Sequence, residues 1–470
     1  MCSPWFAAAI PNPLKSVAWS AALFALGCGI IGASLAAETS PARENTVLLI
    51  SLGGLPASEF QNSGISAPTL RRLASEGASA SRMNSAAPTV SWPNHATIIT
   101  GVAPETNGVL YNGLVVRQGP RLPVLVKPCP RSAILHVPTL YDLAHQAGLT
   151  TAQVSWPPSE DGRTIDWAFG ELAQSKGAFE KELLQAGIVT AADLQEVPIT
   201  VSAKRDDIWC RVFNSIVMQH HPNLLLLRLT DFDAITHKHG LGSPESRAAI
   251  SAADARINQI LDLLRKSGSL DHATIFIVSD QGFKPVRRHI RPNAALQKAG
   301  LLTVAGPSVL SKVVAADAYA LTAGGIAQLF LTNPEHREAT RAEVKKLFSE
   351  MEGIGRVIEP ADYAQCGFPS VAQNKQMGDF VLLAKPGYGF TAAADGEPIT
   401  DVVEGTTLAF HGYQPSDPDM DAIFIAWGQG IRSGVRLEKI SNLDVAPTIA
   451  RVLGLKFDHV DGRVLTEILK

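Results

Sequence analysis

Cysteine, aromatic residues and excess charge are all scarce in this chain of 470 residues. It has five cysteines, 6% aromatic residues and a formal net charge of −3. So few cysteines exclude a small scaffold built on disulfides. The near balance of 41 basic and 44 acidic side chains argues against a dedicated nucleic-acid-binding surface, which needs a basic face. Because 46% of the residues are hydrophobic, a disordered chain is excluded as well.

The three cysteines beyond the N-terminal region, Cys129, Cys210 and Cys366, lie far apart in the sequence. No CxxC pair or Cys/His finger spacing occurs among them, so a thiolate zinc site is not expected. One disulfide at most can form from three cysteines, and the sequence does not decide which two would pair.

Residues 1–36 are expected to be an export signal outside the folded domain. Lys15 is their only charged residue, and the 21 residues from 17 to 37 carry no charge. A basic residue, an apolar run and the small residues Ser34–Ala36 predict a cleaved signal peptide and a periplasmic or extracellular protein. The alternative is an uncleaved anchor, since 21 uncharged residues can span a bilayer. The membrane is otherwise not an expected partner.

Short apolar runs alternate along the chain with segments of helical type. Continuous apolar runs are typical of parallel strands buried on both faces, so the sequence predicts an α/β fold with helices covering a mostly parallel sheet. The expected strands are 47–51, 150–156, 223–229, 273–279 and 421–427, and the expected helices are 68–76, 139–147 and 247–267.

Residues 305–405 interrupt this alternation with polar, glycine- and proline-containing pieces. Two strand-like runs, 325–331 and 379–384, lie among them. We interpret 305–405 as an inserted cap-like α+β region on a core made of 45–304 and 406–470.

Polar side chains gather directly after the expected strands. Asp233 and His237 follow the run 223–229, Asp280 follows 273–279, and His411 precedes 421–427. Ligands of open α/β sheets bind at the carboxyl ends of the strands, so these distant segments are expected to share one crevice. Asp233, His237 and His411 form a His₂Asp set that suits Zn²⁺ with an open coordination position. Each residue alone could equally be an ordinary cap or turn residue.

Ser91 is the candidate nucleophile. It precedes Pro93 at the start of an expected helix, where a serine is commonly an N-cap. The same position also favours catalysis, because a helix N-terminus stabilises an alkoxide or a phosphate. The residues alone leave both interpretations open.

From Val47 to the C-terminus the chain resembles the nucleotide pyrophosphatase/phosphodiesterase branch of the alkaline phosphatase superfamily. The resemblance is carried by PTVSWPNHATIITG at 88–101, DFDAITHKHG at 231–240, SDQG at 279–282 and HGY at 411–413. It implies an alkaline-phosphatase-like core and hydrolysis of phosphodiesters or pyrophosphates. It further implies two Zn²⁺ ions and a covalent phospho-enzyme.

The resemblance assigns roles by position. The nucleophile falls on Ser91, and the asparagine that binds a phosphoryl oxygen falls on Asn112. Ligands of one metal fall on Asp233, His237 and His411. Ligands of the other fall on Gly53, Asp280 and Gln281, together with the nucleophile.

Two of these positions depart from the family pattern. Gly53 stands where an aspartate is expected, and Gln281 stands where a histidine is expected. A glycine offers no side chain and a glutamine amide is a poor zinc ligand, so one zinc site is expected and the second is doubtful. Trp92 is either a substrate contact or a packing residue.

Losing one metal removes several kcal/mol of transition-state stabilisation, at about 1.36 kcal/mol per tenfold in rate. We therefore expect an exported metal-dependent hydrolase of phosphodiester or nucleotide pyrophosphate type, of reduced activity, with a small-molecule substrate. The alternative is a pseudoenzyme that binds one metal or a phosphorylated ligand without efficient turnover. A cation from 284–289 could replace part of the missing charge, although a solvated loop is the simpler expectation. A sulfatase is excluded, because His95 stands where formylglycine formation requires arginine.

Overall fold

The computed structural model describes residues 45–119, 121–171, 177–198, 203–306, 312–403 and 408–470. Pro41–Lys470 forms one compact unit. The expected signal segment, 1–36, lies outside the described residues. Within the described ranges, no helix combines the length and apolar character needed to cross a membrane.

An eight-stranded sheet forms the centre of the molecule, in the order β20-β2-β19-β8-β1-β7-β5-β6. β1 pairs in parallel with both β7 and β8, which confirms the predicted parallel sheet at its centre. Only β19 runs opposite to its two neighbours in this sheet. The bounds are β1 Thr46–Leu52, β2 Ala78–Asn84, β5 Thr151–Val154, β6 Trp167–Phe169, β7 Leu224–Leu229, β8 Ala273–Val278, β19 Ala422–Gly428 and β20 Val435–Ser441.

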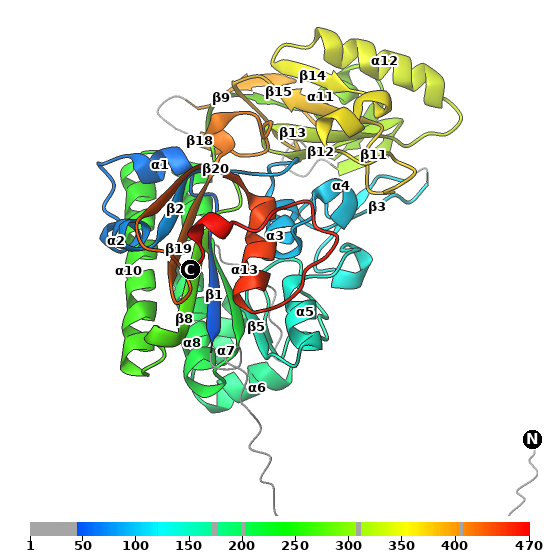
Figure 1. Cartoon of the computed structure of the whole chain (residues 1–470). Coiled ribbons are helices and arrows are strands. Elements are labelled where there is room, and N and C mark those ends of the chain that lie inside the picture. The colour runs from blue at the N-terminus through cyan, green and yellow to red at the C-terminus, as the bar shows by residue number, and fades with distance from the viewer. Residues whose placement is uncertain (1–44, 120, 172–176, 199–202, 307–311, 404–407) are drawn as a thin grey trace, which may run out of the picture. The chain divides into compact units, whose positions relative to one another are not determined.

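Helices cover both faces of this sheet, as Figure 1 shows for α2 and α10 on one side and α3, α5 and α13 on the other. Alternate residues of one strand face opposite sides, so Leu48 and Ile50 belong to one hydrophobic cluster and Val47 and Leu49 to the other. The first face carries α2 Pro68–Glu76, α6 Ala178–Gln185, α7 Ala191–Glu196, α8 Ala203–Gln219, α9 Asp231–His239 and α10 Pro244–Lys266. The second face carries α3 Ser91–Thr100, α5 Leu140–Gln146 and α13 Val445–Val452.

The local sequence explains several of these boundaries. α2 begins with Pro68 at its first position, where the missing N–H costs nothing, and Gly77 follows its end. Thr139 caps α5, accepting from the backbone N–H of Asp142, whose carboxylate accepts in return. Gly101 ends α3 with a φ of 66°, a left-handed conformation that glycine adopts freely.

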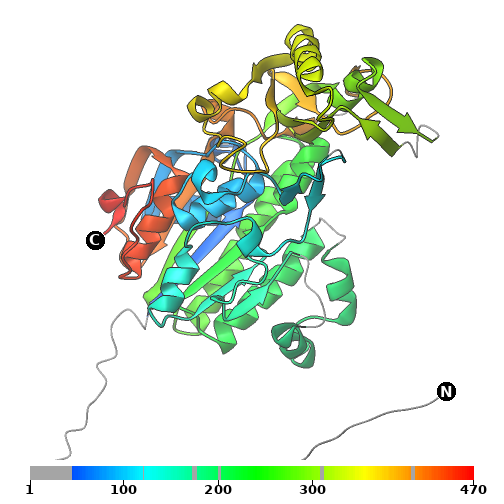
Figure 2. The same ribbon diagram turned by 90° about the vertical axis from the view of Figure 1, so that its right-hand side faces the viewer.

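A second layer of strands lies beside the core and is coloured green-yellow to orange in Figures 1 and 2. It contains a four-stranded sheet β12-β13-β15-β14 and a second four-stranded sheet in which β9 pairs with β16, β17 and β18, and the layer has its own hydrophobic cluster. The bounds are β9 Lys284–Ile290, α11 Pro292–Lys298, β10 Leu302–Ala305, β11 Lys312–Ala316, β12 Ala318–Ala323, β13 Ile326–Leu331, α12 Arg337–Glu350, β14 Ile354–Ile358, β15 Phe380–Ala384, β16 Gly387–Phe390, β17 Ile399–Asp401 and β18 Leu408–Phe410.

This cap layer begins before the predicted boundary at 305. Ile290 and Leu296 already belong to its hydrophobic cluster, and β9 pairs with β16, β17 and β18. The cap contacts the core at Gly108, directly after the short helix at 104–107, where the side-chain amides of Asn374 and Gln376 donate to the Gly108 carbonyl oxygen at 3.0 and 2.9 Å. The other α-helices and strands of the described residues are α1 Ala57–Gln61, α4 Pro104–Asn107, β3 Leu114–Val116 and β4 Val124–Val126.

Candidate active site

The carboxyl ends of three neighbouring strands define the site. β1, β7 and β8 lie side by side in parallel and end at Leu52, Leu229 and Val278. The residues that follow them include Gly53, Asp233 and Asp280. The predicted convergence at one edge of the sheet is therefore present.

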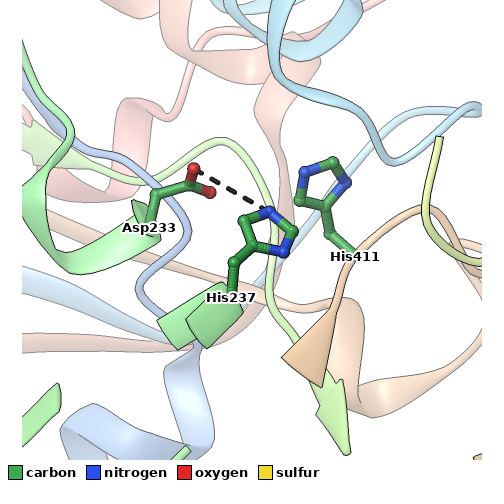
Figure 3. Close-up of side chains that lie close together, drawn as sticks. All are labelled: Asp233, His237 and His411. Carbon is green, nitrogen blue, oxygen red and sulfur yellow. Dashed lines mark ion pairs between the residues drawn. The ribbon is translucent and has the colours of Figure 1, made fainter. Parts of the chain in front are cut away.

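Asp233, His237 and His411 come together as one potential metal-binding group, drawn in Figure 3. One ligand atom from each lies within 4.8 Å of the other two. α9 places Asp233 and His237 one turn apart on one face, with 4.0 Å between His237 Nε2 and an Asp233 carboxylate oxygen. His411 follows β18 of the cap, so the cap supplies the third member of this trio.

The electrostatics of the trio suit a divalent cation. Burial raises the pKa of Asp233, against the opposing effect of His237. Burial and then the neighbouring His237 lower the pKa of His411 to about 3, which keeps this imidazole neutral and able to ligate. Asp233 Oδ1 and His411 Nδ1 are buried without a hydrogen-bond partner among the described residues. A cation would satisfy both atoms, since buried polar groups are costly when unpaired.

Ser91 opens α3 as its first residue, while the N-cap position belongs to Val90. The interpretation of Ser91 as an N-cap is therefore wrong, and its hydroxyl is not used in capping. Ser91 Oγ lies 3.3 Å from His95 Nδ1, one turn further along the helix. That nitrogen also lies 2.8 Å from the Ser91 carbonyl oxygen.

His95 links Ser91 to the core of the site, a role that the sequence did not predict. Its ring is fully buried, with Nε2 2.9 Å from Ser51 Oγ and Nδ1 3.4 Å from Asp280 Oδ2. Burial lowers the pKa of His95 to about 4, although Asp280 opposes the shift. The signal for His95 was the four-residue spacing from Ser91, which places both side chains on one helix face.

The predicted second metal position lacks a set of ligands. Asp280 Oδ1 accepts from the backbone N–H groups of Gly54 at 2.8 Å and Gln281 at 3.2 Å, and its Oδ2 faces His95. Gly53 carries no side chain, and a Cβ there would lie 3.1 Å from the carbonyl oxygen of Leu229. One carboxylate and one hydroxyl do not make a zinc site, so these residues do not fit a second Zn²⁺.

Two further side chains shape this position. The Gln281 carboxamide is fully buried, and neither its oxygen nor its nitrogen has a partner among the described residues. Phe283 is also buried and packs on the trio, with ring centroids 4.8 Å from His237 and 5.5 Å from His411. An apolar ring therefore lines one side of the trio.

Asn112 and Trp92 lie next to Ser91. Asn112 Oδ1 accepts from the backbone N–H of Trp92 at 2.8 Å. The Nδ2 donors of Asn112 take no part in this bond. Trp92 is only 4% exposed, and its side chain packs with Ala96, Val109 and Cys129 in a small hydrophobic cluster. This burial favours the interpretation of Trp92 as a packing residue.

The basic segment 284–289 is not a solvated loop. It forms β9, and Lys284 pairs with Asp417 at 2.6 Å and Asp419 at 3.0 Å. Arg288 pairs with Asp401 at 2.8 Å. These partners neutralise Lys284 and Arg288, so neither of the two replaces the charge of a second metal.

The three cysteines in the described part of the chain are all free. Cys129 and Cys210 are buried, and Cys366 is partly exposed. The disulfide that three cysteines permit is therefore not formed among them.

A mostly parallel α/β core with a capping layer, and a His₂Asp trio at the carboxyl ends of its strands, are the features of an alkaline-phosphatase-like fold. The chain belongs to the type I phosphodiesterase / nucleotide pyrophosphatase family, whose sequence pattern it matches over residues 47–414. This membership identifies it as a protein of phosphoric diester hydrolase type and confirms the resemblance seen in the sequence.

Named relatives are distant but similar over most of this chain. A pyrophosphatase/phosphodiesterase of Schizosaccharomyces pombe is 23% identical over 439 residues, covering 89% of this chain and 79% of its own. Human ectonucleotide pyrophosphatase/phosphodiesterase family member 7 is 21% identical, covering 97% and 88%. The chain spans about half the length of the venom phosphodiesterases it matches, 47% for that of Crotalus durissus collilineatus.

Solved structures support the fold. Human ectonucleotide pyrophosphatase/phosphodiesterase 5 superposes with a TM-score of 0.68 at 18% identity, covering 90% of this chain and 100% of its own. An inactive variant of the murine protein, solved in complex with AMP, superposes with a TM-score of 0.67 at 16% identity, covering 91% and 100%.

Proposed function

We propose that this protein is an exported hydrolase of phosphodiester or nucleotide pyrophosphate bonds that uses Ser91 as nucleophile and one divalent cation. The observation that carries the proposal is the trio Asp233, His237 and His411 on the same edge of the sheet as Ser91. The murine relative bound to AMP supports a nucleotide-type, small-molecule substrate. Export is proposed from the composition of residues 1–36 alone.

Asp233, His237 and His411 would hold the cation, and zinc suits this set of ligands. Bound there, it would supply a positive charge that polarises a phosphoryl oxygen. Because Gly53 and Gln281 provide no usable ligands, we propose one cation per chain.

The chain's own residues then act on the substrate. His95 Nδ1 hydrogen-bonds the Ser91 hydroxyl and orients it, while Asp280 and Ser51 hold the ring of His95. The amide of Asn112 donates to a phosphoryl oxygen. Ser91 Oγ attacks phosphorus as its proton passes to water, the bond from phosphorus to the leaving-group oxygen breaks, and that oxygen takes up a proton. Water then attacks the phosphoserine, which releases the phosphoryl group and returns a proton to Ser91. The N-terminus of α3 favours the negative charge that accumulates at Ser91.

Hydrolysis of bis(4-nitrophenyl) phosphate with added Zn²⁺ tests this proposal, with Ser91→Ala as the matched variant. We expect turnover in the parent, none above background in Ser91→Ala, and about one zinc per chain in both. Equal turnover in the two proteins would remove Ser91 from the mechanism.

The pseudoenzyme is the second candidate, and the incomplete second position specifically favours it. It predicts one bound zinc and no turnover in the parent. A large gain from that baseline when Gly53 and Gln281 are both replaced by ligands would identify it.

A further inference from the structure

A cavity of about 250 Å³ lies where the connection between β3 and β4 meets the end of β13 and the start of α12. None of the residues of the candidate active site lines it. It is called the arginine pocket below, and its walls include Arg117, Arg121, Pro123, Phe330, Pro334 and Arg337. The pocket therefore combines positive charge with an apolar surface.

Three arginine side chains share one buried carboxylate beside this pocket. Arg337 donates to Asp379 Oδ1, and Arg341 lies 3.9 Å from the same oxygen. Arg117 lies 3.5 Å from Oδ2 of Asp379, whose side chain is only 2% exposed. Among the described residues, the other acid that pairs with these arginines is Glu338, which is 3.9 Å from Arg341 and points into solvent at 84% exposure. The positive charge of the group therefore exceeds its negative charge.

Arg117 is the most deeply placed cation of the pocket. Its guanidinium donates to the carbonyl oxygen of Met377 and lies 4.9 Å from the ring centroid of Phe330. Its Nε is buried without a partner among the described residues. Burial lowers the pKa of Arg117, and the nearby Arg337 lowers it further against the opposing effect of Asp379. Because buried like charges and unpaired donors are costly, an anion bound between Arg117 and Arg337 would stabilise both.

Arg337 and Arg121 bring further positive charge to the mouth of the pocket. Arg337 is the first residue of α12, its side chain is 35% exposed, and its Nη1 donates to the Leu331 carbonyl oxygen at 3.1 Å. His336 makes no side-chain capping bond at this helix start, where the helix dipole favours negative charge. Arg121 is exposed and forms no ion pair within the described ranges.

The apolar surface of the pocket limits the kind of anion that fits. Phe330 and Pro123 are buried residues of its wall, and Phe330 packs on Tyr111 and Val115 from the core. The volume of about 250 Å³ is small beside the roughly 300–1,000 Å³ of pockets for drug-sized ligands. A ligand with one ring or a short apolar chain is therefore the size that the pocket accommodates.

We propose that the arginine pocket is a binding site for a small organic oxyanion, a carboxylate or a phosphate monoester that carries one apolar ring or a short apolar chain. Arg117 and Arg337 bind the oxygens, since guanidinium groups pair with both head groups through two parallel hydrogen bonds. The apolar part of the ligand lies against Phe330 and Pro123. This site is separate from the hydrolytic one and does not rest on the proposed function.

Titration of benzoate, its neutral isostere benzamide, and acetate into the whole chain tests the pocket. Binding is followed by the broadening of the proton NMR signals of each probe, which detects weak ligands. Arg117→Met and Arg337→Met each remove one guanidinium. Arg288→Met is the matched control, because Arg288 is a partly exposed arginine of the cap that pairs with Asp401 outside the pocket. Arg117→Lys keeps the charge and guards against misfolding of the Met variant.

We expect benzoate to bind at least about tenfold more tightly than benzamide, because only the anion pairs with the guanidinium groups. Acetate, which lacks the ring, should bind at least about fivefold more weakly than benzoate. Arg117→Met and Arg337→Met should each weaken benzoate binding about tenfold, with Arg288→Met unchanged and Arg117→Lys within about threefold of the parent. Equal affinity for benzoate and benzamide, or unchanged benzoate affinity in both Met variants, overturns the pocket.

Phenyl phosphate distinguishes the two head groups. It also meets the candidate active site, so it is titrated into the Ser91→Ala protein, and only the binding that Arg117→Met removes is assigned to the pocket. Tighter binding of phenyl phosphate than of benzoate identifies a phosphate monoester as the ligand, and the reverse identifies a carboxylate. Binding of both probes that is independent of Arg117 and Arg337 overturns the pocket. None of these outcomes depends on turnover by the parent, so the pocket and the proposed function stand or fall separately.

Discussion

The two sides of the candidate site differ in what they can hold. On one side Asp233, His237 and His411 bring three ligand atoms within 4.8 Å of one another, with two of their polar atoms left unsatisfied. On the other side Asp280 Oδ1 accepts from two backbone N–H groups, while Asp280 Oδ2 lies 3.4 Å from His95 Nδ1 without a hydrogen-bond partner among the described residues, and Gly53 offers no side chain. Among the described residues, only the first side offers three metal-ligating side chains close together, so the site is expected to bind one cation.

The largest effect is expected when the ligand set of Asp233, His237 and His411 loses one of its members. His237→Ala should abolish zinc binding and lower turnover at least about 10³-fold, because the charge on the phosphoryl oxygen is lost. Metal analysis and nitrophenyl phosphodiester kinetics measure both. His239→Ala, in the same helix but outside the trio, is the control and should keep its zinc. Zinc retained in His237→Ala would contradict the trio.

Restoring the other side should give the next largest effect. Gly53→Asp with Gln281→His should bind a second zinc and raise turnover about 10²-fold, since a second cation stabilises the transition state. The Cβ at residue 53 needs a shift of a few tenths of an ångström from the Leu229 carbonyl. Gly53→Ala with Gln281→Leu adds bulk without ligands and should stay at one zinc. One zinc in the restored protein as well would show that the difference between the sides lies elsewhere.

The hydrogen-bond network can be weakened without touching the trio. His95→Gln should lower kcat about 10- to 100-fold with zinc content and KM unchanged, because the Ser91 hydroxyl loses its orientation. Ser51→Ala removes only the bond to Nε2 and should cost a few-fold. Steady-state kinetics with metal analysis checks both, and a His95→Gln protein as fast as the parent would leave His95 without a role.

The smallest effect concerns stability at low pH. Burial raises the pKa of Glu171, but the neighbouring Arg228 and Lys127 outweigh it and lower this pKa from its usual 4.5 to about 2, which corresponds to roughly 3 kcal/mol at 1.36 kcal/mol per unit. A depressed carboxyl pKa gives stability that is present above pH 4.5 and lost as the pH falls towards 2. In Glu171→Gln, the free energy of unfolding measured with urea should no longer show this fall between pH 5 and pH 2.5. Glu105→Gln, at an exposed glutamate of α4, serves as control and should keep it.

The local hydrophobic pattern of the sequence was sufficient to predict the main strands and helices of the core. The run 47–51 lies within β1, 68–76 coincides with α2, and 247–267 overlaps α10 closely. Burial on both faces forces these strands to be apolar throughout, so they are visible without any tertiary information. The start of the cap was placed too late, because β9 carries charged residues whose partners lie far along the chain, such as Asp417, 133 residues beyond Lys284.

The site was visible only in part. Asp233 and His237 are one helical turn apart, a spacing that the sequence displays directly. His95 was missed as part of the site because its partners, Ser51 and Asp280, are 44 and 185 residues distant.

The sequence by itself determined which chemical groups this protein owns: a serine at a helix start, one complete set of ligands, and a glycine and a glutamine in place of two others. Only the tertiary structure decided what surrounds Gly53 and Gln281, and that His95 and Asp280 lie beside Ser91. Composition and spacing act along the chain, whereas electrostatic and hydrogen-bonding energies depend on distances that only folding sets.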